Sequence, residues 1–298
     1  MAPRDQLLTT LEMARFVARG FLRFDALVPE ALNERFMAEV QEGPPPFAPA
    51  GTPLSECYAG TAMAEILRLP RLAGIIESLV GPNPRFDHQG IHFNPPAKVF
   101  EDMGYPVFAQ HTHQDSTIDP RTAFDLQIMY FPHEVEPDMA GTRFIPGTHL
   151  RVVSEMACAR YQNVVGQQKL VCPGGTILAL HHGIWHGGAV NRTDRTRFML
   201  KVRLNPTVRQ CRLWNTDDLT PEMADPQPIF DPSRMFAPDP NDVQSILCKA
   251  EPWFEQDTGR LEFVNRIRLW RHLLGDDDFD AHHWLTRLEN VPPDVRHL

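Results

Sequence analysis

The chain has 298 residues, of which 42% are hydrophobic and 22% are charged, and its formal net charge at pH 7 is -9. This composition is typical of a folded globular protein and excludes a disordered or fibrous chain. The excess of acidic residues argues against nucleic acid as a partner, because phosphate binding requires a basic face. No apolar run approaches the roughly 20 residues of a membrane-spanning helix, so no membrane partner is expected.

The cysteines and the N-terminus indicate a compartment. The five cysteines are widely scattered and form no Cys-x-x-Cys pair, which is typical of reduced thiols. Arg15 and Arg19 interrupt the first apolar stretch, so it does not resemble the apolar core of a secretory signal. We therefore expect a cytoplasmic protein.

The first 82 residues carry mostly helical signals. Apolar residues recur with helical spacing before Gly20, which is a typical helix stop, and Pro70 breaks a later helical segment. The expected elements of this part are helices at 7–19, 29–40 and 64–80 and a strand at 21–24.

From residue 86 to about 207 the pattern changes to period two, with Gly, Pro, Asn and Asp between short apolar segments. Many short strands without intervening helices favour an antiparallel sandwich or barrel over a Rossmann sheet. The strands are expected near 86–94, 108–115, 122–131, 142–146, 176–181 and 195–205.

A Pro/Asp-rich passage follows residue 208, and helical segments are expected near 240–248, 260–274 and 280–290. We interpret these as additions to the same domain. The chain is thus expected to be one domain over 1–298, with N-terminal helices at 1–82, a β core at about 83–207 and a C-terminal helical extension at about 208–298.

One triplet has the spacing of metal ligands. His113-Gln114-Asp115 places an imidazole and a carboxylate at i and i+2 of an expected strand, on one face of it. His186 is the best candidate for a third ligand, whereas His182 lies too far along the chain from it to bind the same ion. Two histidines and one carboxylate on one side of an ion are the ligand set of non-haem Fe(II) oxygenases. A structural zinc site would favour four closed ligands.

Arg197 lies eleven residues beyond His186, on the last expected strand. An arginine fork binds a carboxylate through two hydrogen bonds, which a dicarboxylate co-substrate beside the metal would require. Between the two halves of the triad lies the turn sequence Pro146-Gly147-Thr148-His149.

Together these motifs resemble the phytanoyl-CoA dioxygenase family of Fe(II)/2-oxoglutarate oxygenases. The resemblance covers roughly residues 10–205 and rests on the His-x-Asp triplet, the Pro-Gly-Thr-His turn, and the distal His186 with Arg197. It implies a mainly β fold with flanking helices around a double-stranded β-helix (a jelly-roll, cupin-like core), and Fe(II), 2-oxoglutarate and O₂ as cofactors. Members of the family often carry a lysine before a Pro-Pro pair, where this chain has Asn94.

Two further residues could contact the co-substrate. Gln127 lies on the face of its strand opposite to Phe124, Leu126, Ile128 and Tyr130 and should point into the barrel, where it either contacts the co-substrate carboxylates or is a polar edge residue. His92 shares a face with Asn94 and could have the same role.

The period of two also suggests substrate contacts. If Arg197 points inward, Lys201 and Arg203 lie on the same face and would bring two cations to the cavity. Either Asp125 neutralises one of them or the substrate supplies negative charge, with Asn94 as a further polar contact. Alternatively, the end of the strand emerges into solvent.

These features predict an oxygenase that hydroxylates or otherwise oxidises an unactivated C–H bond of a small polar or anionic metabolite. One alternative is a cupin-like metal enzyme that does not use 2-oxoglutarate. The other is a non-catalytic binding protein on the same fold. The sequence leaves the substrate, the oligomeric state and the role of the C-terminal extension open.

Overall fold

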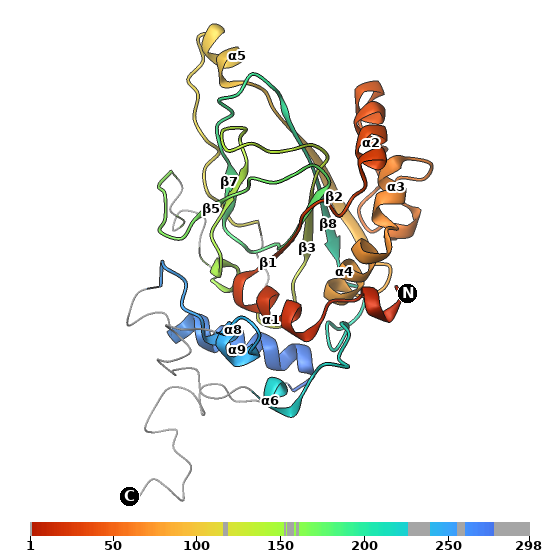
Figure 1. Cartoon of the computed structure of the whole chain (residues 1–298), viewed down its shortest axis with the longest axis vertical. Helices are drawn as coiled ribbons and strands as arrows, with labels where there is room; N and C mark the ends of the chain where they lie inside the picture. Colours follow the sequence, from red (N-terminus) through yellow and green to blue (C-terminus); the bar gives the residue numbers. More distant parts are fainter. Residues whose placement is uncertain are drawn as a thin grey trace, which may run out of the picture.

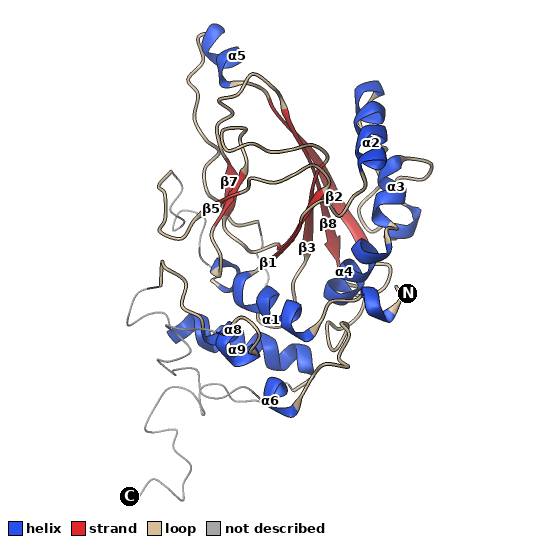
Figure 2. Cartoon of the chain, viewed as in Figure 1, coloured by secondary structure: helices blue, strands red, loops and turns tan. Residues whose placement is uncertain are grey.

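Two antiparallel sheets face each other at the centre of the computed structural model, with helices beside the larger sheet and beneath both sheets (Figures 1 and 2). The structure describes residues 2–115, 119–151, 153, 158, 161–225, 239–254 and 260–276. The helices are α1 (Thr10–Arg19), α2 (Glu30–Glu42), α3 (Ala62–Leu67), α4 (Pro70–Val80), α5 (Ala97–Asp102), α6 (Pro221–Ala224), α8 (Val243–Cys248) and α9 (Arg260–Leu274), with short 3-10 turns η1 (Arg4–Gln6), η2 (Leu54–Glu56) and η3 (Thr148–Leu150). The strands are β1 (Phe21–Phe24), β2 (Arg85–Asn94), β3 (Leu126–Phe131), β4 (Thr142–Phe144), β5 (Gln168–Lys169), β6 (Thr176–His181), β7 (His186–Gly188) and β8 (Arg197–Asn205).

The larger sheet has the strand order β1-β6-β3-β8-β2, and the smaller sheet has the order β5-β4-β7. The strand pairings within both sheets are antiparallel, and neighbours in the sheets are mostly distant in the sequence. This is the pattern of a double-stranded β-helix, in which strands from both halves of the core alternate.

The two faces of the larger sheet bury different clusters. On the outer face, Ile128 and Tyr130 of β3 and Leu200 and Val202 of β8 pack into a large core with the surrounding helices. On the inner face, Met129 and Met199 belong to a second apolar cluster between the sheets, as the alternation of a strand requires. The inward direction expected for the Arg197 face of β8 is confirmed by this arrangement.

Local sequence signals explain the first helix. Thr9 and Glu12 form a reciprocal capping box at the start of α1, and Gly20 ends the helix with φ = 78°. The chain then enters β1, which pairs with β6 at the edge of the larger sheet.

The C-terminal extension packs against the N-terminal part. Residues of α8 and α9, including the fully buried Trp270, share the large core cluster with residues of α1. Figure 1 shows these helices beneath the sheets, next to α1. The helix expected near 280–290 lies outside the described residues, and the single-domain organisation stays a prediction.

One expected strand is wrong. Residues 108–115 do not form a strand, and in this segment only His113 makes a β-bridge, to His186. The segment instead runs beside β7, where the N–H of Gln110 donates to the carbonyl oxygen of Gly188 at 3.0 Å and His113 bonds with His186. The two segments lie so close that a Cβ at Gly187 would be 2.8 Å from the carbonyl oxygen of His111. The short strands β5 and β7 were not expected, since two or three residues carry too little alternation to be recognised.

No helix in the described part of the chain is long and apolar enough to cross a membrane.

Candidate metal centre

His113, Asp115 and His186 come together at one point between the sheets. The Nε2 atom of His113 lies 3.4 Å from Oδ1 of Asp115, and Nε2 of His186 lies 3.5 Å from Oδ2. One potential ligand atom from each residue lies within 4.8 Å of the other two. In the residues that the structure describes, this is the only such group of three.

The backbone fixes the relative position of the two histidines. The N–H of each donates to the carbonyl of the other, at 2.9 Å from His113 to His186 and 3.0 Å in the reverse direction. Asp115 follows two residues later without strand geometry. The bridge at His113 thus replaces the continuous strand that we expected to align the triplet.

Hydrogen bonds to the backbone also select the tautomer of both rings. Nδ1 of His113 lies 3.1 Å from the carbonyl oxygen of His111, and Nδ1 of His186 lies 3.0 Å from that of Ile184. With Nδ1–H donating to these carbonyls, both Nε2 lone pairs face Asp115. This arrangement lets both imidazoles act as metal ligands through Nε2.

The electrostatics agree with that arrangement. Burial lowers the pKa of His186 to about 4, with Asp115 acting in the opposite direction, so the imidazole is neutral at pH 7. Burial raises the pKa of Asp115, but His186 and Lys201 outweigh it and hold this pKa below its ordinary value. A neutral imidazole and an ionised carboxylate are the protonation states that bind metal.

A cavity of about 350 Å³ opens beside this centre. It is lined by His92, Asn94, Phe108, Gln110, His113, Met129, Thr142, His186, Gly187, Gly188, Ala189, Arg197, Met199 and Lys201. A volume of this size is that of a small-molecule site.

Arg197 forms part of the cavity wall and is 2% exposed. Its Nη2 donates to the carbonyl oxygen of Ala140 at 2.9 Å, whereas its Nε and Nη1 have no hydrogen-bond partner among the described residues. Burial lowers the pKa of Arg197 to about 10, which leaves the group charged at pH 7. A buried cation with free donors is suited to a carboxylate ligand.

The two other residues expected at the co-substrate lie in different places. His92 is on the cavity wall, opposite Met199 in the β2–β8 register. Burial, followed by the charges of Lys201 and Arg197, lowers its pKa to about 4. Gln127 is buried on the inward face of β3 and its Oε1 has no partner among the described residues, but it is not part of the cavity wall.

The four residues expected at the substrate divide into two pairs. Asn94 and Lys201 lie on the cavity wall, and Nζ of Lys201 is 3.7 Å from Oδ2 of Asp115. Arg203 instead forms an ion pair with Asp125 and does not line the cavity. Of the two alternatives for the cations on this strand, Asp125 thus neutralises Arg203, and only Lys201 remains at the cavity.

Several wall residues were missed from the sequence. Thr142 comes from β4, and Phe108 and Gln110 come from the segment beside β7, where Oε1 of Gln110 accepts from the N–H of Gly188 at 2.9 Å. A threonine and a glutamine carry no spacing signal of their own. Only the close passage of these segments in the fold brings them to the cavity.

An apolar hollow adjoins the cavity at Phe108. This hollow of about 280 Å³ shares Asn94, Phe108 and Ala189 with the cavity and is also lined by Phe93 and Phe100. All three phenylalanines are exposed, and Phe108 is 71% exposed. Exposed apolar groups gathered at one opening favour contact with an apolar part of a ligand.

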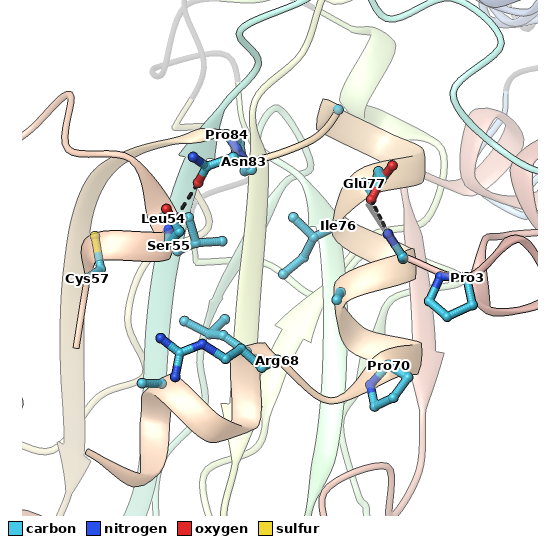
Figure 3. Close-up of a pocket in the computed structure, with 15 residues that line it drawn as sticks. Pro3, Leu54, Ser55, Cys57, Arg68, Pro70, Ile76, Glu77, Asn83 and Pro84 are labelled. Atoms are coloured by element: carbon cyan, nitrogen blue, oxygen red, sulfur yellow. Dashed lines mark hydrogen bonds between the residues drawn. The ribbon is translucent and has the colours of Figure 1, made fainter. Parts of the chain in front are cut away.

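A second cavity, of about 400 Å³, lies away from this centre, between α3, α4 and the N-terminal residues (Figure 3). Oε2 of Glu77 accepts a hydrogen bond from the N–H of Ala2 at 2.7 Å, and Oδ1 of Asn83 accepts one from that of Ser55 at 3.0 Å. No group of three metal ligands occurs among the described residues that line it.

Comparison with known proteins bears on the class of this site. The sequence model of the phytanoyl-CoA dioxygenase family (PhyH) matches residues 55–199, a range that includes the triad and Arg197. A comparison with curated protein sequences found no match. The match confirms, over residues 55–199, the resemblance to the phytanoyl-CoA dioxygenase family that was drawn from the sequence, and enzymes of that family use Fe(II), 2-oxoglutarate and O₂.

Solved structures with a similar fold include HygX from Streptomyces hygroscopicus with nickel and 2-oxoglutarate bound, at a TM-score of 0.51 and 14% identity over 67% of this chain and 88% of HygX. HygX with nickel, 2-oxoglutarate and hygromycin B bound gives 0.50 and 14% over 69% and 88%. The non-haem α-ketoglutarate-dependent epimerase SnoN from nogalamycin biosynthesis gives 0.49 and 16% over 66% and 80%. The HygX likeness confirms the expected fold, mainly β with flanking helices around a jelly-roll core.

Proposed function

We propose that this protein is an Fe(II)/2-oxoglutarate-dependent oxygenase that hydroxylates or otherwise oxidises an unactivated C–H bond of a small molecule. The observation that carries the proposal is the position of Arg197, with unpaired guanidinium nitrogens, in the same cavity as His113 and His186, which lie beside Asp115. The family match over this region supports it.

The donor set fits the iron. His113, Asp115 and His186 would hold Fe(II) on one side, because both Nε2 lone pairs are free of backbone partners and face an ionised carboxylate. Fe(II), 2-oxoglutarate and O₂ together supply the oxidising power for attack on a C–H bond in enzymes of this family. The chain's own contribution is to bind and orient the co-substrate and the substrate and to exclude water.

Arg197 would bind the distal carboxylate of 2-oxoglutarate through two N–H groups on one edge of the guanidinium: the second N–H of Nη2 together with either Nε or Nη1, both of which lack a partner among the described residues. Its Nη2 bond to Ala140 fixes the plane of the guanidinium before the ligand arrives. His92 is neutral at pH 7 and could donate or accept one hydrogen bond at the same wall. We retain Gln127 as a weaker candidate for the co-substrate, since its free Oε1 faces the barrel interior.

The substrate is proposed to carry an anionic or strongly polar group. Lys201 is a partly buried cation at the cavity, and Asn94 adds an amide to the same wall. The apolar hollow at Phe108 would accommodate the remainder of the molecule. Arg203 and Asp125 already satisfy each other and would act on the substrate only through the shape of the site.

The two alternatives are distinguishable by co-substrate chemistry. An enzyme without 2-oxoglutarate has no need for an unsatisfied arginine fork at the metal, which favours the proposed function over a cupin-like enzyme. A binding protein without activity would bind a ligand but release no succinate.

Anaerobic loading with Fe(II) followed by 2-oxoglutarate tests the proposal. We expect stoichiometric iron, a visible metal-to-ligand charge-transfer band on addition of 2-oxoglutarate, and succinate release in air. His186→Ala should abolish iron binding and the band while the fold is kept. His88→Ala, which changes a histidine paired with Asp87 outside the cavity, is the matched control. Full iron binding by His186→Ala would refute the ligand assignment.

A further inference from the structure

The C-terminal extension contacts one turn of the core, and that turn contacts both segments that carry the candidate metal ligands. We call residues 145–151, which include η3, the bracing turn. We propose that the extension positions the metal ligands through this turn, so that Trp253 is a positioning residue for the metal centre. The inference rests on the metal centre proposed above.

The extension binds the bracing turn through hydrogen bonds and an ion pair. Nε1 of Trp253 donates to the carbonyl oxygen of Pro146 at 2.7 Å, and Nδ2 of Asn265 donates to that of Leu150 at 3.3 Å. Nη2 of Arg151 lies 2.8 Å from Oε1 of the buried Glu262. The Arg151 guanidinium also lies over the Trp253 ring, 5.0 Å from its centroid.

The bracing turn is in turn hydrogen-bonded to the backbone next to His186. The N–H of Trp185, the residue before this ligand, donates to Oγ1 of Thr148 at 3.0 Å. The carbonyl oxygen of Trp185 accepts from the N–H of Ile145 at 3.0 Å. Both polar backbone groups of Trp185 are therefore bonded to the turn.

The same turn reaches the other two ligands. Nε2 of Gln114 donates to the carbonyl oxygen of Arg151 at 3.2 Å, and Gln114 lies between His113 and Asp115. Trp253 also packs against the buried cluster of Ile145, Cys158 and Trp185. The bracing turn thus contacts the backbone next to His186 and the side chain between the other two ligands, and the extension that holds the turn lies outside the region that the family match covers.

The consequence concerns metal affinity. A ligand set binds tightly when the groups around it hold it within about 0.5 Å of the required geometry. Loss of one outer support loosens the three ligands together, because they share the bracing turn. We therefore expect a change at Trp253 to weaken metal binding although Trp253 is no ligand.

The test compares two tryptophans of the same extension. Trp253→Phe removes the N–H bond to Pro146, and Trp270→Phe removes an equivalent N–H bond from Trp270 to the carbonyl oxygen of Met223. Ni(II) is the probe, and its dissociation constant is measured by titration calorimetry together with the urea midpoint of the metal-free protein. We expect both variants to lower the urea midpoint. Only Trp253→Phe should weaken Ni(II) binding, by roughly tenfold, the low end of the effect of outer-shell groups.

Amide hydrogen exchange gives a readout that is independent of the metal. The N–H of Trp185 should exchange faster in Trp253→Phe than in Trp270→Phe, since only the former loosens its acceptor Thr148. Equal Ni(II) affinity and equal exchange in the two variants would overturn the inference.

Thr148 provides a second variant in case Trp253→Phe does not fold. Thr148→Val removes the acceptor on the ligand side of the turn and should weaken Ni(II) binding, and Thr148→Ser should restore it. In the double variant the effect of Trp253→Phe should be smaller than in the wild type, because both residues act through one path. Fully additive losses would contradict a shared path, and a wild type that binds no Ni(II) would overturn the metal centre itself.

Discussion

Arg197 is a cation that the folded chain itself leaves largely unsatisfied. Of its three guanidinium nitrogens, only Nη2 has a hydrogen-bond partner among the described residues, and the residue is almost completely buried. Burying such a charge costs free energy in the absence of an anion. In the proposed function this free energy is recovered when the carboxylate of the co-substrate binds.

Replacing this residue should separate stability from co-substrate binding. In Arg197→Met we expect the apparent requirement for 2-oxoglutarate to rise roughly ten- to a hundred-fold, since a charged hydrogen bond contributes about 1.5–3 kcal/mol. The free energy of unfolding of the ligand-free protein should stay equal or increase, because an unpaired buried charge is lost. Steady-state kinetics and urea unfolding measure the two effects. Unchanged dependence on 2-oxoglutarate would disprove the carboxylate role.

Lys201 differs from Arg197 because it already has an anionic neighbour, the carboxylate of Asp115. In Lys201→Met we expect the KM of the substrate to rise, with no loss of iron affinity, since the cation repels the metal and attracts an anionic substrate. Lys98→Met is the matched control, because Lys98 is an exposed lysine on α5 that pairs with Asp102. Arg203→Met should affect the fold more than the KM, since Arg203 is paired with Asp125. Equal substrate KM values in Lys201→Met and the Lys98 control would exclude substrate contact by Lys201.

At the scale of elements, the junction between α1 and β1 depends on a glycine. Gly20 has φ = 78°, and a Cβ there would lie 2.5 Å from Nδ1 of the buried His149, in the bracing turn. The ring of His149 is fixed in turn by Nε2, 3.0 Å from the carbonyl oxygen of Val17 in α1. The end of the helix and the bracing turn thus pack without space for a side chain.

Two glycine substitutions separate backbone strain from packing at this junction. Gly60 has a similar φ of 80° but open space around its Cα. We expect Gly60→Ala to cost about 1–2 kcal/mol of unfolding free energy from left-handed backbone alone. Gly20→Ala should cost about 1–3 kcal/mol more, because the methyl group overpacks the site. Equal losses of unfolding free energy in Gly20→Ala and Gly60→Ala, measured in urea titrations, would show that the His149 ring moves aside with no loss of stability.

At the scale of the whole molecule, buried histidines make stability depend on pH. His149 and His181 are completely buried, and their ring centroids are 4.9 Å apart. Burial lowers the pKa of His181 to about 3 and the pKa of His149 well below its ordinary value. Both rings are therefore neutral in the folded protein near neutral pH.

The sign of the pH effect follows from the protons bound in each state. Below about pH 6.5 the unfolded chain protonates these rings and the folded chain does not, so stability falls as the pH falls toward 3. Each such histidine removes about 1.4 kcal/mol per pH unit in that window. Urea unfolding of the metal-free protein at pH 6 and pH 5 measures how the free energy of unfolding changes with pH. This slope should be smaller in His181→Gln than in the wild type by about 1.4 kcal/mol per pH unit. An unchanged slope would mean that His181 is protonated in the folded state.

The local spacing of residues was sufficient to predict the elements and the ligand types. The helical periods before Gly20 and over 64–80, and the alternation in β2, β3, β6 and β8, correspond to elements of the structure within a few residues at their ends. Their buried faces are set by period alone, which is a property of the chain. The outward and inward faces of β8 could be assigned for the same reason.

Contacts between distant segments could be decided only by the tertiary structure. The period-two pattern predicted a strand over 108–115, but the segment only runs beside β7 and is held there by the bridge of His113 to His186. Likewise, Lys201 lies near Asp115, whereas Arg203, two residues further along the same face, forms an ion pair with Asp125, the residue before β3. Period two gives the side of a strand but not the partner that another segment brings to it. For that physical reason the sequence determined which residues face the barrel, and only the packing of its strands determined which of them meet at the metal centre.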